Sequence, residues 1–453
     1  MSTTELAVIL YGQHIADVRQ SSGGQFTLRY RDERGTTPVS LSMPLVRTEH
    51  RNSAVKPFLD GLLPDREDVR AEMGREFGVN GRNSFQLLRH VGLDCAGAVQ
   101  FCEPSAVPAV IARQGSLHPI GEPEIGARLA ALAESSTRSW VAPTERWSLA
   151  GAQSKFALHR VGGRWFEARG ATPTTHIIKP GVATLHDQAL NEHVCLTAAA
   201  RLGLNDAASE YIEFDGHPAI VVGRYDRRPD SGGTGQVRIH QEDMCQAMSV
   251  APDQKYETDG GPGTARILQL LRASARPQDQ YSFLKYQAYN YLVGGSDAHA
   301  KNFSLLLAGR EVRLAPMYDV ASTYPYEGVD HGLPIAIDGK RAYGSLNDNN
   351  WANVARRAHL DSGRVVDTVH DLAAGLPDAL SDTISEARAA GIRIEGLANR
   401  MLPQIGEVCA AVGWQRRVGG GVTNDPVRAK TTPASNTGSF ASRQLNEGDT
   451  GLL

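Results

Sequence analysis

The sequence predicts an α+β protein of two lobes with a cleft between them. Short apolar runs with partial alternation, typical of strands, dominate the chain up to about residue 250. Helical periodicity dominates from about residue 256 onward. At 453 residues the chain is too long for one ordinary core, so two or three domains are expected. A strand-rich half followed by a helix-rich half therefore indicates two packed lobes.

The composition narrows the class of protein. Hydrophobic residues make up 41% of the chain and charged residues 21%, as in a soluble globular protein. The net charge of −3 gives no reason to expect nucleic-acid binding through bulk charge, although a local basic patch would still allow it. The sequence contains no apolar run of about eighteen residues and no basic, apolar N-terminal signal, so neither a membrane span nor secretion is predicted.

The five cysteines are scattered, without CxxC spacing or zinc-type pairing. This pattern favours reduced, buried thiols in a cytoplasmic protein. The cysteines are Cys95, Cys102, Cys195, Cys245 and Cys409.

Turn residues and apolar runs divide the chain into five segments. Residues 1–105 predict an N-terminal module with strands at 6–11, 25–30, 39–45 and 96–101 and helices at 54–63, 66–77 and 84–90. Residues 106–146, rich in Pro, Ala, Glu and Arg, predict a linker carrying one amphipathic helix at 124–133.

The remaining three segments carry the two lobes and a tail. Residues 147–250 predict a β-rich lobe with strands at 156–159, 165–167, 176–179 and 219–222 and a helix at 189–204. Residues 251–415 predict a helical lobe, broken by a hairpin-like stretch at 302–319, with helices at 281–293, 365–374, 380–390 and 394–412. Residues 416–453 contain few apolar residues and predict a disordered tail.

The most informative segment is residues 294–304, where Asp297 stands five positions before Asn302. A second apolar run, 312–317, leads directly into Tyr318 and Asp319. In a kinase site of this layout, the first Asp orients the attacking hydroxyl, while the Asn and the second Asp hold magnesium ions. Hard oxygen ligands of this kind suit magnesium. On spacing alone, ordinary turn-capping residues are the alternative interpretation.

Three other segments carry possible nucleotide chemistry. The small residues of 149–155 would let backbone N–H groups approach phosphate oxygens, with Lys155 adding charge, although a plain turn explains them as well. Lys179 ends an apolar strand, where it could pair phosphates or lie on the surface. Glu192 could orient that lysine or favour a helix start. Residues 221–228 lead from a strand into a charged stretch, which is either an adenine-binding hinge or a solvated loop.

Taken in order, these segments resemble the HipA family of serine/threonine kinases, the toxin half of bacterial HipA–HipB toxin–antitoxin pairs. The resemblance covers about residues 5–412 and includes WSLAGAQ at 147–153, KYETDGGPG at 255–263 and DAHAKNFS at 297–304. It implies a bilobal protein-kinase-like (PI3/4-kinase-like) fold with a β-rich N-lobe, an extra N-terminal subdomain and an all-helical C-lobe. The other matching segments are 40–45, 58–65, 173–179, 191–196, 225–228, 241–246 and 316–319.

The resemblance also implies a role for each matching residue. Asp297 would be the catalytic base, Asn302 and Asp319 the magnesium ligands, and Lys179 a catalytic phosphate contact. Ser148 would be the serine that such kinases autophosphorylate to inactivate themselves. The residues implied to bind ATP are Ala150, Gly151, Ala152, Gln153, Ser154, Lys155, Lys179, Gly223, Arg224, Tyr225, His299, Lys301, Asn302, Tyr318 and Asp319.

The phosphate loop departs from the family pattern at one point. Gln153 and Ser154 stand where many members have a Glu before the Lys, which leaves the local geometry of this loop open.

The cofactors implied by the resemblance are ATP and Mg²⁺, and the implied partners are a HipB-like antitoxin and, through it, operator DNA. The implied substrate is a translation component such as an aminoacyl-tRNA synthetase, for example the glutamyl enzyme, whose phosphorylation would arrest growth. Two alternatives stay open, a catalytically silent co-repressor and a small-molecule phosphotransferase on the same fold. Retention of Lys179, Asp297, Asn302 and Asp319 counts against the silent protein.

Overall fold

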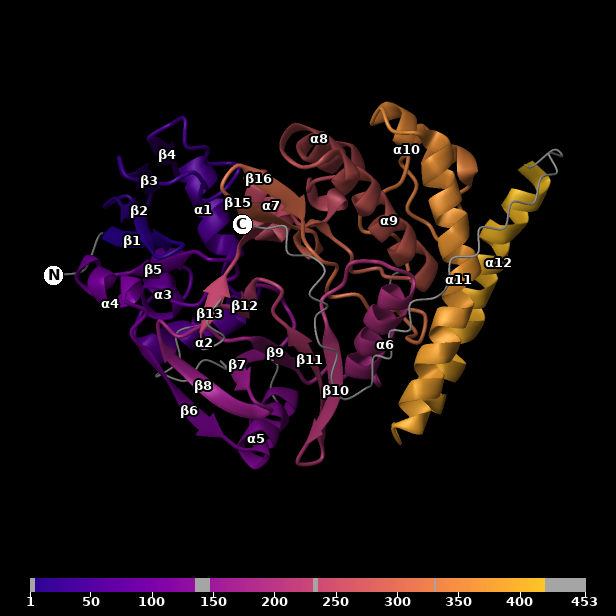
Figure 1. The fold of residues 1–453 in the computed structure, drawn as a ribbon, viewed down its shortest axis with the longest axis horizontal. Coiled ribbons are helices and arrows are strands. Elements are labelled where there is room, and N and C mark those ends of the chain that lie inside the picture. The colour runs from indigo at the N-terminus through magenta and orange to yellow at the C-terminus, as the bar shows by residue number, and fades with distance from the viewer. Residues whose placement is uncertain (1–4, 135–146, 231–234, 330, 420–453) are drawn as a thin grey trace.

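The computed structural model describes residues 5–134, 147–230, 235–329 and 331–419. Within these residues the strands form sheets of five, six, two and three strands. In Figure 1 the strand-rich parts lie on one side and the long helices α11 and α12 on the other. The α+β class and the order of a strand-rich half before a helix-rich half are therefore as the sequence predicts.

The N-terminal module (residues 5–102) is a five-stranded antiparallel sheet, in the order β4-β3-β2-β1-β5, packed with three helices. Asn83 caps α3 by accepting a hydrogen bond from the Gln86 N–H, and Gly78 ends α2 in the left-handed conformation at φ 64°. The elements are β1 Glu5–Leu10, β2 Gln13–Gln20, β3 Phe26–Tyr30, β4 Glu49–Arg51, α1 Asn52–Gly61, α2 Glu67–Phe77, α3 Ser84–Val91 and β5 Gln100–Cys102.

The prediction of a strand at 39–45 is wrong. That segment forms only an isolated bridge, and two of its backbone groups form hydrogen bonds with the Tyr30 hydroxyl. The hydroxyl accepts from the Val39 N–H at 2.8 Å and donates to the Met43 carbonyl at 2.7 Å. The strand next to β1 is instead β2, which the sequence analysis missed. A tertiary side-chain contact, invisible to local periodicity, decides the conformation here.

The segment predicted as a linker, 106–146, is not only a connection. After η1 Pro104–Ala106 and α4 Val107–Ile111, residues Gly115–Ile120 form β6, which pairs with β8 as the edge strand of the next sheet. The predicted amphipathic helix is present as α5 Glu122–Glu134. Residues 135–146 lie outside the described part of the chain.

The second module is a six-stranded antiparallel sheet in the order β10-β11-β9-β7-β8-β6, with α6 packed against β10 and β11. Its remaining elements are β7 Phe156–Val161, β8 Arg164–Gly170, β9 His176–Lys179, α6 Gln188–Arg201, β10 Ser209–Phe214 and β11 His217–Gly223.

The C-terminal lobe (residues 240–419) is not the all-helical lobe that the family resemblance implies, but it does contain the hairpin predicted at 302–319. The hairpin of β15 and β16 turns at Gly309 (φ 63°), and β14 pairs with β15 to give a three-stranded sheet. Burial of Leu305 and Leu307 holds this sheet in the lobe's core. The strands are β14 His240–Asp243, β15 Ser304–Ala308 and β16 Glu311–Leu314, and a separate ribbon is β12 Arg227–Pro229 with β13 Gln236–Arg238.

Helices make up the rest of this lobe. The two helices predicted at 365–374 and 380–390 are one continuous helix, α11, with Pro377 inside it. The predicted disordered tail begins within α12, and its residues 420–453 lie outside the described part of the chain. The helices are α7 Met244–Ala247, α8 Thr264–Ser274, α9 Pro277–Val293, α10 Asp348–Arg357, α11 Ser362–Ala389 and α12 Glu395–Gly419, with short turns η2 Pro252–Gln254, η3 Glu257–Asp259 and η4 Ala300–Asn302.

Strand β11 presents alternate side chains to two cores. Ile220 and Val222 lie in the core formed with α6 and the C-terminal lobe, whereas Ala219 and Val221 lie in the core shared with the N-terminal module. The six-stranded sheet is therefore packed on both faces, and the N-terminal module shares its main core with it. No helix in the described ranges is long and apolar enough to cross a membrane.

Candidate active site

A cavity of about 820 Å³ is lined by residues of the six-stranded sheet, the C-terminal lobe and the N-terminal module. It gathers most of the residues expected to bind nucleotide from segments far apart in the chain. Ser154 is buried and does not line it, and neither does Ser148. The predicted residues that line the cavity are Ala150, Gly151, Ala152, Gln153, Lys155, Lys179, Gly223, Arg224, Tyr225, Asp297, His299, Lys301, Asn302, Tyr318 and Asp319.

Lys179, the last residue of β9, lies between two carboxylates. Its Nζ is 2.7 Å from Glu192 Oε1 and 2.8 Å from Asp319 Oδ1. Burial opposes the charge of this ammonium, but the two carboxylates outweigh it and raise the pKa of Lys179 above its usual range. Helix α6 begins at Gln188, so Glu192 lies beyond its first turn, and of its two possible roles the structure has the one that orients Lys179.

Asp319 has a left-handed backbone, with φ 58°, which a non-glycine residue seldom adopts and which aspartate tolerates better than most. Burial alone would raise the pKa of this carboxyl. The ammonium groups of Lys179 and Lys155 reverse that effect and hold its pKa well below the usual range. The carboxylate is therefore ionised at neutral pH and able to bind a cation.

Asp297 lies on the loop that follows the C-terminus of α9, and its side chain is 66% exposed. The Tyr256 hydroxyl donates to its Oδ1 at 2.8 Å, and His299 Nε2 lies 3.7 Å from the same oxygen. Asn302, in the short turn η4, donates its amide to the Asp297 backbone carbonyl at 2.7 Å. The loop thus brings a solvent-accessible carboxylate next to the amide side chain that sequence spacing paired with it.

The phosphate-loop segment folds over Lys155, whose Nζ donates to the Ala150 carbonyl at 2.7 Å. Gly151 has φ +101°, and a Cβ there would lie 2.8 Å from Lys155 Nζ, so a side chain would displace the ammonium. Burial and the nearby Lys179 lower the pKa of Lys155 to about 8. Gln153 contacts Gln188 at the start of α6 through an amide–amide hydrogen bond of 3.0 Å.

Ser148 lies outside the cavity and is 1% exposed. Its hydroxyl donates to the Leu62 carbonyl at 2.6 Å, and its N–H donates to the Asp94 carbonyl at 3.1 Å. Both acceptors belong to the N-terminal module, which therefore holds the segment that precedes the phosphate loop.

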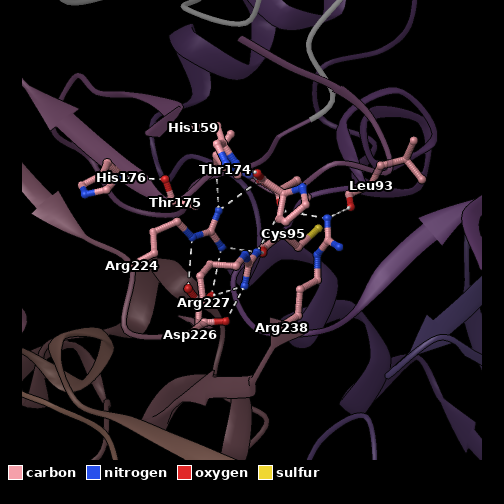
Figure 2. Close-up of polar contacts among 12 residues, drawn as sticks. Leu93, Cys95, His159, Thr174, Thr175, His176, Arg224, Asp226, Arg227 and Arg238 are labelled. Atoms are coloured by element: carbon pink, nitrogen blue, oxygen red, sulfur yellow. Dashed lines mark hydrogen bonds and ion pairs between the residues drawn. The ribbon is translucent and has the colours of Figure 1, made fainter. Parts of the chain in front are cut away.

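The charged stretch after β11 is buried, so its interpretation as a solvated loop is wrong. Arg224, Asp226 and Arg227 are 6%, 2% and 5% exposed. Figure 2 shows their side chains in one network of hydrogen bonds and ion pairs that also includes Arg238. Asp94 of the N-terminal module joins these four residues, which we call the buried charge cluster.

Asp94 is the centre of this cluster. Its carboxylate lies 3.2 Å from Arg224, 2.9 Å from Arg227 and 3.2 Å from Arg238, and also accepts from the N–H and hydroxyl of Thr174. Burial opposes ionisation, but the three guanidinium groups hold the pKa of Asp94 well below its usual range. Asp226 accepts from the Gly97 N–H at 2.6 Å, a second contact to the N-terminal module.

The segment expected to bind adenine, residues 223–225, therefore has fewer free polar groups than a nucleotide-binding hinge would offer. Arg224 lines the cavity, but its guanidinium points into the buried charge cluster. The N–H groups of Gly223 and Arg224 donate to the carbonyls of Ala208 and Thr175, at 2.8 and 2.9 Å. A base bound at this hinge would have to use carbonyl groups or the next residue, Tyr225.

Sequence reasoning missed three cavity residues. The three are Asp65, Lys255 and Tyr256. Asp65, from the N-terminal module, forms ion pairs with Lys255 and with Lys301. The Tyr256 hydroxyl contacts Asp297. All three lie in segments that carry the family resemblance, but no local pattern assigns them a chemical role. Lys301, expected to reach a phosphate, is already paired with Asp65.

Comparison with known proteins places the chain in a family. The HipA-like C-terminal domain matches residues 147–380, and the HipA N-terminal domain matches residues 6–102. The chain belongs to the HipA family. Among relatives, the putative kinase Y4mE of Sinorhizobium fredii is 34% identical over 83% of this chain and 90% of its own length.

The Shewanella oneidensis serine/threonine-protein kinase toxin HipA is 29% identical over 77% of this chain and 81% of its own. A chain in the solved structure of the S. oneidensis toxin–antitoxin system HipA, HipB and its operator DNA complex superimposes with a TM-score of 0.77. That chain is 26% identical, and the match covers 91% of this chain and 99% of that one. Family membership makes the chain a protein kinase, as the sequence analysis expected.

Proposed function

We propose that this HipA-family chain transfers the γ-phosphoryl group of ATP to a serine or threonine hydroxyl of another protein, on a bilobal, PI3/4-kinase-like fold. The observation that carries the proposal is the double ion pair of Lys179 with Glu192 and Asp319 inside one cavity. A lysine held by a helix glutamate beside a metal-binding aspartate is the arrangement that a kinase needs to grip ATP phosphates.

Two residues suit a magnesium ion. Asp319 is kept ionised by lysines, and Asn302, which lines the same cavity, would supply an amide oxygen. Magnesium is usually bound by one or two protein ligands and completes its shell with water and substrate phosphates, so this small donor set fits it. The ion would neutralise charge on the phosphates and hold them in place.

Asp297 suits the part of the base. Its side chain lines the cavity and is 66% exposed, so a hydroxyl on a folded protein can reach it. It would accept the proton of that hydroxyl as the oxygen attacks the γ-phosphorus and ADP leaves. Lys179 and the phosphate loop would hold the leaving group, and the exposure of Asp297 favours a macromolecular acceptor over a small enclosed one.

Adenine would lie at the hinge, near Tyr225 and Tyr318, whose ring centroids are 5.7 Å apart. Because the N–H groups of Gly223 and Arg224 are already used, adenine would have to bond to carbonyl groups of this segment or to Tyr225.

Ser148 would be the site of self-inactivation. A phosphate group carries a charge of about −1.5 to −2 and could not stay where the hydroxyl now donates to the Leu62 carbonyl, because two acceptors would then face each other without water. Modification would therefore expel Ser148 from its buried site and displace the phosphate loop that follows it.

We further propose a place for the chain in a toxin–antitoxin pair. The partner would be a HipB-like antitoxin, in keeping with the complex that the S. oneidensis HipA forms with HipB and operator DNA. A net charge of −3 indicates that most DNA affinity would come from that partner. The acceptor would be a translation component, such as an aminoacyl-tRNA synthetase, in the cytoplasm, where the five free cysteines of this chain stay reduced.

Intact mass spectrometry with Mg-ATP tests the proposal, with the wild type beside Asp297→Asn. We expect the wild type to gain one phosphate, mapped to Ser148, and the variant to gain none. If neither protein gains mass, and phosphatase releases none beforehand, a silent co-repressor is the better description of this chain.

A further inference from the structure

Residues 62–65 of the N-terminal module, between α1 and α2, lie against the phosphate-loop segment. The Leu62 carbonyl accepts from the Ser148 hydroxyl, and the Asp65 N–H donates to the Gly151 carbonyl at 3.1 Å. Pro64 and Gly151 also form a parallel bridge. The backbone of this short segment therefore holds the phosphate loop at two points.

The side chain of Asp65 points the other way, to the catalytic loop. Its Oδ1 forms an ion pair with Lys301, and its Oδ2 lies 3.1 Å from Lys255 Nζ. The Asp65 and Lys301 side chains are 12% and 4% exposed. Burial opposes ionisation of Asp65, but the two ammonium groups hold its pKa at about 2. Asp65 is thus ionised at neutral pH, and its contact with Lys301 is shielded from solvent.

We propose that Asp65 is a positioning residue of the phosphoryl-transfer site, acting through Lys301. The inference rests on the proposed kinase function and adds that the N-terminal module supplies part of the active site. A lysine side chain is a flexible stem with three donors on its ammonium. Asp65 fixes the ammonium of Lys301 on the cavity wall and leaves its other donors for phosphate oxygens.

Among the described residues, no carboxylate other than Asp65 forms an ion pair with Lys301. Asp243 lies near enough to interact with Lys301 electrostatically, but it caps α7 and accepts from the Gln246 N–H at 2.8 Å. Asp297 contacts Tyr256 and His299 instead. Without Asp65, Lys301 would lose the one carboxylate with which it forms an ion pair in the described part of the chain.

The test compares Asp65→Asn with a matched control, Glu67→Gln, which removes an exposed carboxylate of the same module paired with Arg82. The measured quantities are phosphate release to water at saturating Mg-ATP, which needs no protein acceptor, and equilibrium affinity for ATP. We expect the saturated rate of Asp65→Asn to fall by about 10- to 100-fold, since small misplacements of a catalytic group have effects of this size. ATP affinity should change much less, and Glu67→Gln should match the wild type.

A double-mutant cycle with Lys301→Met identifies the route of the effect. If Asp65 acts through Lys301, adding Asp65→Asn to Lys301→Met lowers the rate no further. The inference is overturned if Asp65→Asn keeps the wild-type rate, or if it costs the same factor in the Lys301→Met protein, which a purely structural role would produce.

Two further measurements keep the test decisive. Should Asp65→Asn not fold, Asp65→Glu can be used instead. It keeps the negative charge but lengthens the side chain by one methylene group, which displaces the ammonium of Lys301. A folded Asp65→Glu protein with a reduced saturated rate supports the inference, and one with an unchanged rate overturns it. A wild type that gains no phosphate in the mass assay, and from which phosphatase releases none beforehand, refutes the proposed function itself. An active wild type with an equally active Asp65→Asn refutes only the inference.

Discussion

Replacing Asp94 by asparagine should destabilise the protein strongly, because the carboxylate is the centre of the buried charge cluster. Asp94 is 3% exposed and faces three guanidinium groups at 2.9 to 3.2 Å. The cluster then holds three arginines against Asp226 alone, and its formal charge rises from +1 to +2 in a buried site. Breaking a buried ion pair by removing one partner costs about 3–5 kcal/mol.

Urea unfolding followed by circular dichroism measures this cost, provided that the slopes of the transitions agree. The matched control is Asp17→Asn in the same module, whose partners are Arg31, 51% exposed, and His14, 19% exposed. The loss of these contacts near the surface should cost about 1 kcal/mol or less. The reasoning is refuted if Asp94→Asn and Asp17→Asn lower the free energy of unfolding equally.

Because the pKa of Asp94 is lowered in the folded protein, the same experiment should also depend on pH. A carboxyl whose pKa is lower in the folded state stabilises the protein above the unfolded-state value of about 3.9. That stabilisation is lost as the pH falls from this value through the lower folded-state pKa. The Asp94→Asn protein lacks this contribution, so its stability should decline less steeply over that acid range than the stability of the wild type.

Three further predictions concern the cavity. Since the pKa of Lys155 is lowered to about 8, its charge is lost as the pH rises through that value. ATP affinity measured by titration calorimetry should therefore fall above about pH 8. Lys155→Arg should bind ATP without this pH dependence, and an identical pH profile in the variant would exclude Lys155 as the cause. Ser148→Ala should abolish self-phosphorylation in the mass assay and lower stability by about 1–3 kcal/mol, because the buried Leu62 carbonyl loses its donor; persistent labelling would move the modified site elsewhere. Tyr256→Phe should lower the transfer rate about tenfold at unchanged ATP affinity, because Asp297 loses the hydroxyl that orients it. A tenfold lower rate corresponds to about 1.4 kcal/mol less transition-state stabilisation. An unchanged rate would show that Asp297 does not need this hydroxyl.

Local patterns predicted the segments of the site better than its contacts. The spacing of Asp297 and Asn302 and the strand end at Lys179 are short-range features, and the fold brings all three to one cavity. The charged stretch after β11 was ambiguous because charge in a sequence usually means solvent exposure. Its burial depends on Asp94, which is 133 residues away from Arg227. No periodicity carries information about such a partner.

The same distance explains why Asp65 was missed, since 236 residues separate it from Lys301. An aspartate after Pro64 at the start of a helix has an adequate local explanation as a turn residue. Only the tertiary structure places it against the catalytic loop. Residues that act across a module boundary are thus the ones that sequence spacing is least able to predict.

These cross-boundary contacts argue against treating the N-terminal module as a separable appendage. Asp94 satisfies the arginines of the hinge, residues 62–65 hold the phosphate loop and Lys301, and Glu242 beside the cavity accepts from the Leu41 N–H at 2.8 Å. A chain cut before Trp147 would leave three buried guanidinium groups facing Asp226 alone and would expose one face of the six-stranded sheet. The segments expected to form the phosphate loop, the hinge and the catalytic loop each contact a group from this module, so the geometry of the cavity is a property of both parts together.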